Sequence, residues 1–290
     1  MSNILKDYLA FNDEVNRSHS KFEQSKGLWK KTKIIGGYGL HKNDMGISEL
    51  DEVVFEKENM VPLIGVQYAM ETIFGIKGEL VIPTLNETMG IGAQGSSIQP
   101  SGGMPYPYGQ KVCLFGVGTG GAAENNITVL DIGYHETGIA DMVPFRYTND
   151  ALSNTDINKY YGKKIVDSTL AYYLKKFDND PKIYHLYKNG EDGEDGSAID
   201  SSYFVNGSEI GVESFVEMDL TISKKDVREW FNHNANIEQA RVNTIALFTA
   251  IYDASKNDYA NIQLFSKLNI PTEPLAITKD MSIIYRVYGA

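Results

Sequence analysis

The stretch VCLFGVGTGG, residues 112–121, spells G-x-G-x-x-G directly after an apolar run. In a dinucleotide-binding fold such glycines end a buried parallel strand and open a helix, whose N-terminal N–H groups hold the pyrophosphate. Here AAENN follows Gly121, and then comes the β-branched run ITVLDIGY at residues 127–134. Five residues are too few for a crossover helix, which with its loops needs about 10 to 12 residues. We therefore predict a strand, a glycine-rich loop whose glycines supply positive φ, and a second strand.

Along the rest of the chain, the hydrophobic patterns predict helices and strands in mixed order. Helices are expected at residues 3–15, 60–75, 156–177, 223–231 and 236–252. Strands are expected at residues 79–83, 216–222, 261–268 and 275–288, and Asn206-Gly207 predicts a hairpin turn. This order favours the α+β class, with a mixed, largely antiparallel sheet, packed helices and long loops. We expect an N-terminal helix and arm over residues 1–49, with residues up to Lys33 in the arm, and an α+β structural domain over 50–290.

The strand predicted around residue 219 shows a clear alternation. Val216, Met218, Leu220 and Ile222 alternate with Glu217, Asp219 and Thr221. Because successive side chains of a strand point to opposite faces, we expect the carboxylates to lie on a face exposed to water.

Charge and cysteine content exclude some classes of protein. The chain of 290 residues carries a formal net charge of −11, which argues against a general nucleic-acid clamp. Its one cysteine, Cys113, lies in an apolar strand and is expected to be a small buried hydrophobe. The N-terminus has no apolar core of a secretion signal, and no run reaches the ~18 to 20 apolar residues that cross a bilayer. We expect no membrane association.

The sequence contains no arrangement that points to catalysis. It has no G-x-x-x-x-G-K-[ST] and no G-x-S-x-G, and its five histidines lie far apart. His135-Glu136 begins an H-E-x-x-H pattern, but Ile139 stands where the second histidine is required. We therefore predict no catalytic, cofactor-binding or metal-ligating residues, no cofactor, and a protein that is not an enzyme.

Two loops stand out by composition. The loop at residues 86–110 has glycine, proline and serine but no apolar period, and we predict that Met104, Tyr106 and Tyr108 contact a partner protein. The acidic loop KNGEDGEDGSAID, residues 188–200, has carboxylates that could bind Ca²⁺ or Mg²⁺, although their order does not match an EF-hand. The interpretation that we prefer is a flexible or partner-facing loop.

Several stretches taken together resemble virion structural proteins of tailed bacteriophages, in particular head and neck or connector components. They are MVPLIGVQYAMETIFG, KVCLFGVGTGG followed by DMVPFRY, the acidic KNGEDGEDG turn, and the ending LFSKLNIPTEPLAITKDMSIIYRVYGA. The resemblance covers about residues 50–290. It implies a ring-forming neck or head-to-tail connector protein, located in a virion that is assembled in the host cytoplasm.

The implied partners are copies of the chain in a ring or tube and neighbouring virion proteins. DNA would pass without specific binding, because an acidic lining repels it, and Asp192 and Glu194 are candidates for that channel-facing loop. The alternatives are a tail tube or capsid accessory protein and, in another class, a nucleotide- or metal-dependent enzyme that uses Gly116–Gly121. A helix after Gly121 would favour the enzyme, and a strand would favour the virion protein.

Overall fold

The computed structural model divides the protein into two compact units, and each is described separately. Unit 1 comprises Met1–Asn59, Asn179–Leu220 and Ser282–Ala290, and unit 2 comprises Met60–Asp178 and Thr221–Met281. The structure describes residues 29–59, 65, 68–69, 84–93, 110–123, 127–133, 135–188, 211–234 and 240–289.

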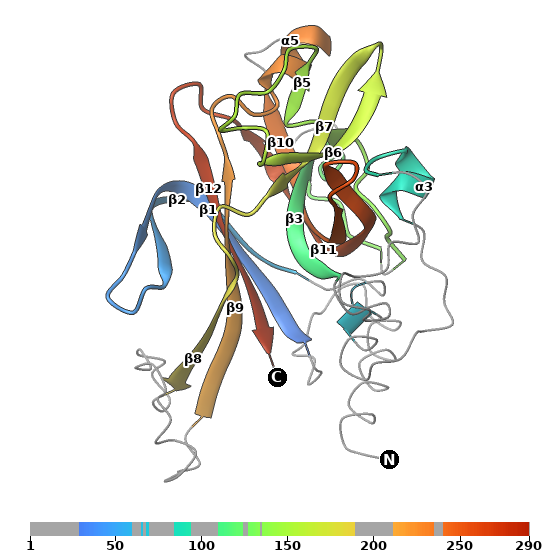
Figure 1. The fold of residues 1–290 in the computed structure, drawn as a ribbon. Helices are drawn as coiled ribbons and strands as arrows, with labels where there is room; N and C mark the ends of the chain where they lie inside the picture. The colour runs from blue at the N-terminus through green and yellow to red at the C-terminus, as the bar shows by residue number, and fades with distance from the viewer. Residues whose placement is uncertain are drawn as a thin grey trace. The chain divides into compact units, whose positions relative to one another are not determined.

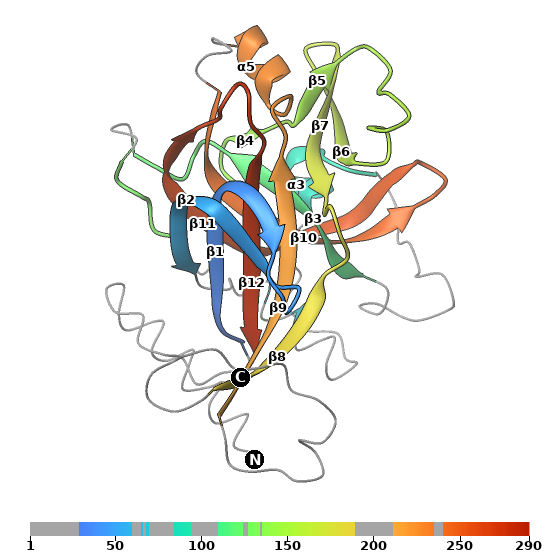
Figure 2. The same ribbon diagram turned by 90° about the vertical axis from the view of Figure 1, so that its left-hand side faces the viewer.

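Unit 1 is built on a five-stranded antiparallel sheet with the order β2-β1-β12-β9-β8. Its strands are β1 (Trp29–Lys42), β2 (Ser48–Asn59), β8 (Lys182–Lys188) and most of β9 (Gly211–Ile222) and β12 (Met281–Gly289). Figures 1 and 2 show β1, β12 and β9 side by side between β2 and β8. Segments from three distant parts of the sequence thus form one sheet.

The start of β1 corrects the prediction that an arm extends to Lys33. Trp29–Lys33 and the glycine-rich residues that follow belong to a 14-residue strand, which pairs with both β2 and β12. A side chain at Gly36 would overlap the ring of Phe55, so this glycine makes room for a core aromatic of β2. The predicted division at residue 49 falls near the start of β2, within the β1–β2 hairpin.

Unit 2 contains a seven-stranded sheet that runs β11-β10-β3-β7-β5, with β4 paired to β3 and β6 paired to β7. Its strands are β3 (Lys111–Gly118), β4 (Met142–Val143), β5 (Arg146–Thr148), β6 (Tyr160–Val166), β7 (Thr169–Lys176), β10 (Arg241–Asp253) and β11 (Asp258–Pro274). The helices with described bounds are short, α3 (Leu85–Met89) and α5 (Arg228–Asn234).

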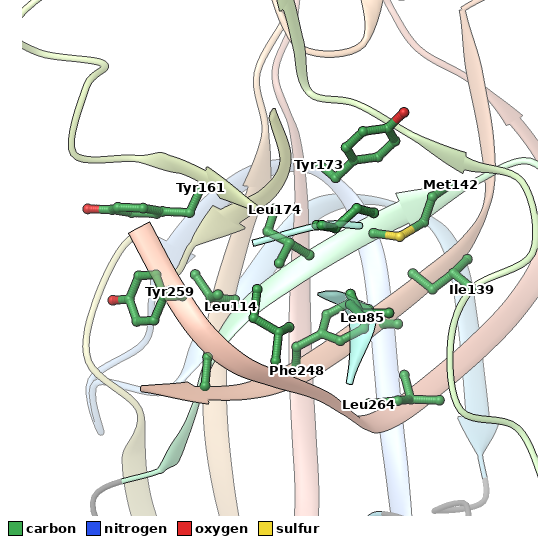
Figure 3. Close-up of a cluster of buried hydrophobic side chains, with 14 of the residues drawn as sticks. Leu85, Leu114, Ile139, Met142, Tyr161, Tyr173, Leu174, Phe248, Tyr259 and Leu264 are labelled. Atoms are coloured by element: carbon green, nitrogen blue, oxygen red, sulfur yellow. The ribbon is translucent and has the colours of Figure 1, made fainter. Parts of the chain in front are cut away.

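The hydrophobic core of unit 2 lies among β3, β7, β10 and β11. Figure 3 shows Leu114, Leu174 and Phe248, which come from three of these strands and are completely buried. Cys113 is also buried there, as predicted, and burial raises the pKa of its thiol to about 12. Fully burying one such apolar side chain contributes roughly 1.5 to 3 kcal/mol, so the burial of these side chains stabilises the unit.

The helix predicted at residues 156–177 is wrong, because this segment forms the β6–β7 hairpin. Asp167 and Ser168 connect the strands, and both have positive φ, at 48° and 65°. Two consecutive residues with positive φ form the tight turn that matches strand twist. The aromatic and β-branched residues of the segment, including Tyr160, Tyr161 and Ile165, favour strands.

The helix predicted at residues 236–252 is also wrong, because residues 241–253 form β10. Nearly every position of this strand is buried, so both of its faces are covered. Such a strand has a continuous apolar sequence without alternation, and this pattern resembles the wide apolar stripe of a helix. The α+β class with packed helices is therefore contradicted, and the protein is mostly β, with two antiparallel sheets.

Other predicted elements have different outcomes. The terminal strands exist as β11 and β12, and the residues predicted to link them, 269–274, continue β11. The described residues of the predicted helix 60–75, namely Gly65, Tyr68 and Ala69, are helical. The first residues of the predicted loop at 86–110 belong to the helix α3. Its N-cap residue, Thr84, accepts a hydrogen bond through Oγ1 from the N–H of Glu87.

The elements predicted at 3–15, 79–83 and 206–207 lie outside the described residues. In the part of the chain that is described, no helix has the length and apolarity to span a membrane.

Candidate functional site

A cluster of four charged residues around the buried Ser48 joins four strands of unit 1. Glu217 and Asp219 of β9 are only 3% and 5% exposed, which corrects the prediction that they face water. They lie against Lys42 at the end of β1, Ser48 at the start of β2, and Arg286 of β12. We call these five residues the hairpin-anchor cluster, because they hold the end of the β1–β2 hairpin.

Ser48 is the centre of the hairpin-anchor cluster and is completely buried. Its N–H donates to Oε1 of Glu217 at 2.8 Å, and its carbonyl oxygen accepts from Nη2 of Arg286 at 2.8 Å. Its hydroxyl donates to Oδ1 of Asp219. The first residue of β2 is therefore held through its backbone and its side chain at once, so the path of the hairpin is closely defined.

The charges within the cluster balance. Arg286 donates through Nε to Oε2 of Glu217 at 2.9 Å, and Lys42 donates to Oδ2 of Asp219 at 2.8 Å. Two carboxylates therefore face two cations. A buried charge is costly unless it is paired and hydrogen-bonded, and this condition is met here.

The contact between Lys42 and Ser48 resembles a serine–lysine nucleophilic pair. The ammonium group of Lys42 donates to Oγ of Ser48. In such a pair the lysine must lose its proton to act as a base. Burial favours the neutral amine of Lys42, but hydrogen bonds and charge attraction from Asp219 and Glu217 outweigh it, and the pKa of Lys42 is raised. Lys42 therefore stays protonated near neutral pH and holds structure instead of accepting the serine proton.

A hollow of about 140 Å³ opens beside the cluster. It is lined by Lys42, Asn179, Asp180, Lys182, Glu217 and Asp219. Its lining has both signs of charge, and the described carboxylates of the cluster already accept hydrogen bonds from protein donors. Within the described residues, no group of three or more His, Cys, Asp or Glu side chains could hold a metal ion.

The β1–β2 hairpin that this cluster anchors presents β2 as an edge strand of the sheet. Glu49, Asp51, Glu52 and Glu56 are exposed on it, and the side chain of Val53 is 54% exposed. The register shifts between Gly36 and Gly37, so that Val54 is an extra residue in β2. At the other edge, Ile183 of β8 is 67% exposed.

The glycine-rich loop of unit 2 is occupied by the protein itself. The N–H of Gly121 donates to Oδ1 of Asn243 at 2.7 Å, and the side-chain amide of Asn243 donates to the carbonyl of Thr119 at 3.0 Å. A side chain at Gly121 would overlap the backbone of β10, and one at Gly118 would meet Ile139. These glycines permit close packing, and the predicted positive φ values are not found at them.

The described residues that follow Gly121, 122–123 and 127–133, form neither the helix of a nucleotide site nor a full strand. Ala122 makes one antiparallel bridge with Val129, and the N–H of Leu130 donates to the carbonyl of Gly121 at 2.9 Å. No helix occurs in residues 119–123 or 127–133. The predicted second strand is thus reduced to one bridge, and the helix that would favour the enzyme alternative is not found in these residues.

The interface and channel residues predicted from the sequence, Met104, Tyr106, Tyr108, Asp192 and Glu194, lie outside the described residues, and the structure does not test them.

The sequence pattern does not predict the hairpin-anchor cluster. One sign was available in the sequence. Phe215 lies two residues before Glu217 and four before Asp219, so the three side chains share one face of the strand, and a large apolar side chain on that face argues against its exposure to water. Nothing in the sequence connects residue 48 with residues 217 and 286. The chain matches no protein-family model, no curated protein and no solved structure.

Proposed function

We propose that this protein is a structural component of a tailed bacteriophage virion, and most specifically a ring-forming neck or head-to-tail connector protein. The observation that carries the proposal is the long exposed edge strand β2, anchored at its start by the buried cluster of Ser48, Glu217 and Arg286. An unpaired strand edge is a template for association with another chain. The sequence resemblance to head and neck components supports the virion assignment.

The buried charges of unit 1 fit such a role. Their hydrogen bonds are used to fix the hairpin, and they hold Lys42 in its charged form. A surface that is held rigid loses less conformational freedom when it associates, so association costs less free energy. The partners proposed are further copies of the chain and neighbouring virion proteins.

The enzyme alternative has less support. The backbone and side-chain amide of Asn243 occupy the position beside Gly121 at which a phosphate would have to approach. Titration calorimetry with NAD, FAD and ATP should therefore show no saturable heat. Micromolar binding that Gly118→Val abolishes would restore the alternative.

Electron microscopy and sedimentation velocity of the purified full-length chain test the proposal. We expect rings of uniform diameter, in a population that grows with protein concentration. Open tubes would support self-assembly but would indicate the tail-tube variant. A protein that remains a single copy at every concentration and forms no ring would contradict the proposed function.

A further inference from the structure

The five-stranded sheet of unit 1 ends in two different edges. One edge is β2, with 12 residues, and the other is β8, with seven residues. Among the described residues, β2 pairs only with β1 and β8 pairs only with β9. Each strand therefore has one row of backbone donors and acceptors without a neighbouring strand in the described part of the chain.

The two edges differ in charge. The sequence of β2, SELDEVVFEKEN, has five acidic residues and one lysine. The sequence of β8, KIYHLYK, has two lysines and no acidic residue. Glu52 on β2 and Lys182 on β8 are both exposed. Like charges directly opposite each other destabilise a strand pair, whereas opposite charges favour it. Pairing β2 with β8 is thus favoured by charge, and pairing β2 with another β2 is not.

Each edge also exposes apolar side chains. Val53 is 54% exposed on β2, and Ile183 is 67% exposed on β8. The acidic residues of β2 and its bulge at Val54 protect this edge against pairing with a like edge, whereas the two lysines of β8 have the charge that complements it. Each of these two exposed β-branched side chains gains a packing partner when another strand is added beside its edge.

The strand directions are compatible with a repeating contact. In an antiparallel sheet of five strands, the first and the fifth run in the same direction, so β2 and β8 are parallel to each other. When copies are related by rotation about one axis, β8 of one copy meets β2 of the next as a parallel ladder. Such a head-to-tail contact uses two different surfaces and generates a ring where the rotation closes.

We propose that β8 of one copy pairs with β2 of the next, so that the sheet of unit 1 continues from copy to copy. This inference rests on the proposed function and names the surfaces through which the copies associate. The partner is a second copy of this chain, and the contact is heterologous. The hairpin-anchor cluster determines the position of the acidic edge by holding Ser48.

Two variants of the full-length chain block one edge each. The β2-blocked variant carries Glu52→Lys and Val53→Lys, and the β8-blocked variant carries Lys182→Gln and Ile183→Glu. The control is Ile277→Glu, which changes an equally exposed isoleucine in the segment between β11 and β12. Circular dichroism reports whether each variant is folded, and sedimentation velocity reports its assembly. If a double variant does not fold, Glu52→Lys alone and Lys182→Gln alone replace them.

We expect each blocked variant by itself to lose assembly, and the control to assemble like the unchanged protein. An equal mixture of the two variants should form dimers and nothing larger, because the intact β8 of one pairs with the intact β2 of the other. Dimers in the β8-blocked variant by itself would indicate β2–β2 pairing and overturn the inference. Normal assembly of both variants would overturn it too, while the proposed function would stand. An unchanged protein that never assembles would overturn both.

Discussion

At the scale of single residues, the decisive feature of unit 1 is the position of Glu217. Its carboxylate accepts from the N–H of Ser48 and from the guanidinium of Arg286, at 2.8 and 2.9 Å. In the sequence Glu217 alternates with apolar residues, a pattern typical of a strand with one face exposed to water, yet its side chain is buried. Burial is possible because cations from β1 and β12 neutralise the charge.

Glu217→Gln should destabilise unit 1 by about 3 kcal/mol, because breaking a buried ion pair leaves the partner charge without compensation. Arg286, which is largely buried, would keep its charge beside a neutral amide. Urea unfolding followed by circular dichroism measures the change. The control is Glu52→Gln on the exposed face of β2, expected to stay within about 0.5 kcal/mol of the unchanged protein. Equal effects of the two substitutions would contradict the role given to Glu217.

At the scale of elements, two segments with helical hydrophobic patterns form strands. In β10 the reason is burial on both faces, which removes the alternation by which strands are recognised. In the β6–β7 hairpin the reason is the turn at Asp167-Ser168, whose residue types are less distinctive than Asn-Gly. Thus the local pattern was ambiguous, and pairing with neighbouring strands decided the outcome.

Changing Asp167-Ser168 to Asn-Gly should stabilise unit 2 by about 1 kcal/mol. Both positions have positive φ, a conformation that glycine and asparagine adopt at a lower cost than serine and aspartate. Thermal unfolding of the double variant should show a higher midpoint. Ser168→Ala keeps a β-carbon at the strained position and should give no gain. A lower midpoint in the Asn-Gly variant would show that the cost of positive φ at these two positions does not limit the stability of unit 2.

At the scale of the whole molecule, neither compact unit is a single continuous segment. The sheet of unit 1 joins strands near the start of the chain, near residue 215 and at its end, and β12 lies between β1 and β9. Unit 2 has its own core, built on β3, β7, β10 and β11. The stability of unit 1 therefore depends on the last strand of the chain.

Removal of residues 282–290 should unfold the sheet of unit 1 and leave unit 2 folded. The deletion takes away the strand that connects the β1–β2 hairpin to the β8–β9 hairpin. Hydrogen exchange measured by mass spectrometry should show lost protection in β1, β2 and β9, with β3, β10 and β11 still protected. The full-length chain is the reference. Loss of protection in β10 as well would mean that the two units unfold together.

The local sequence pattern predicted those features of the protein that depend on neighbouring residues. It located the apolar strand that buries Cys113 and predicted the strands near the C-terminus, because composition and short-range pattern suffice for these. Two features depend on tertiary contacts: residues 241–253 form a strand buried on both faces, and Glu217 is buried against Ser48 and Arg286. The physical reason is that strand pairing and charge compensation join residues more than 60 positions apart, whereas a sequence pattern reports only on neighbours.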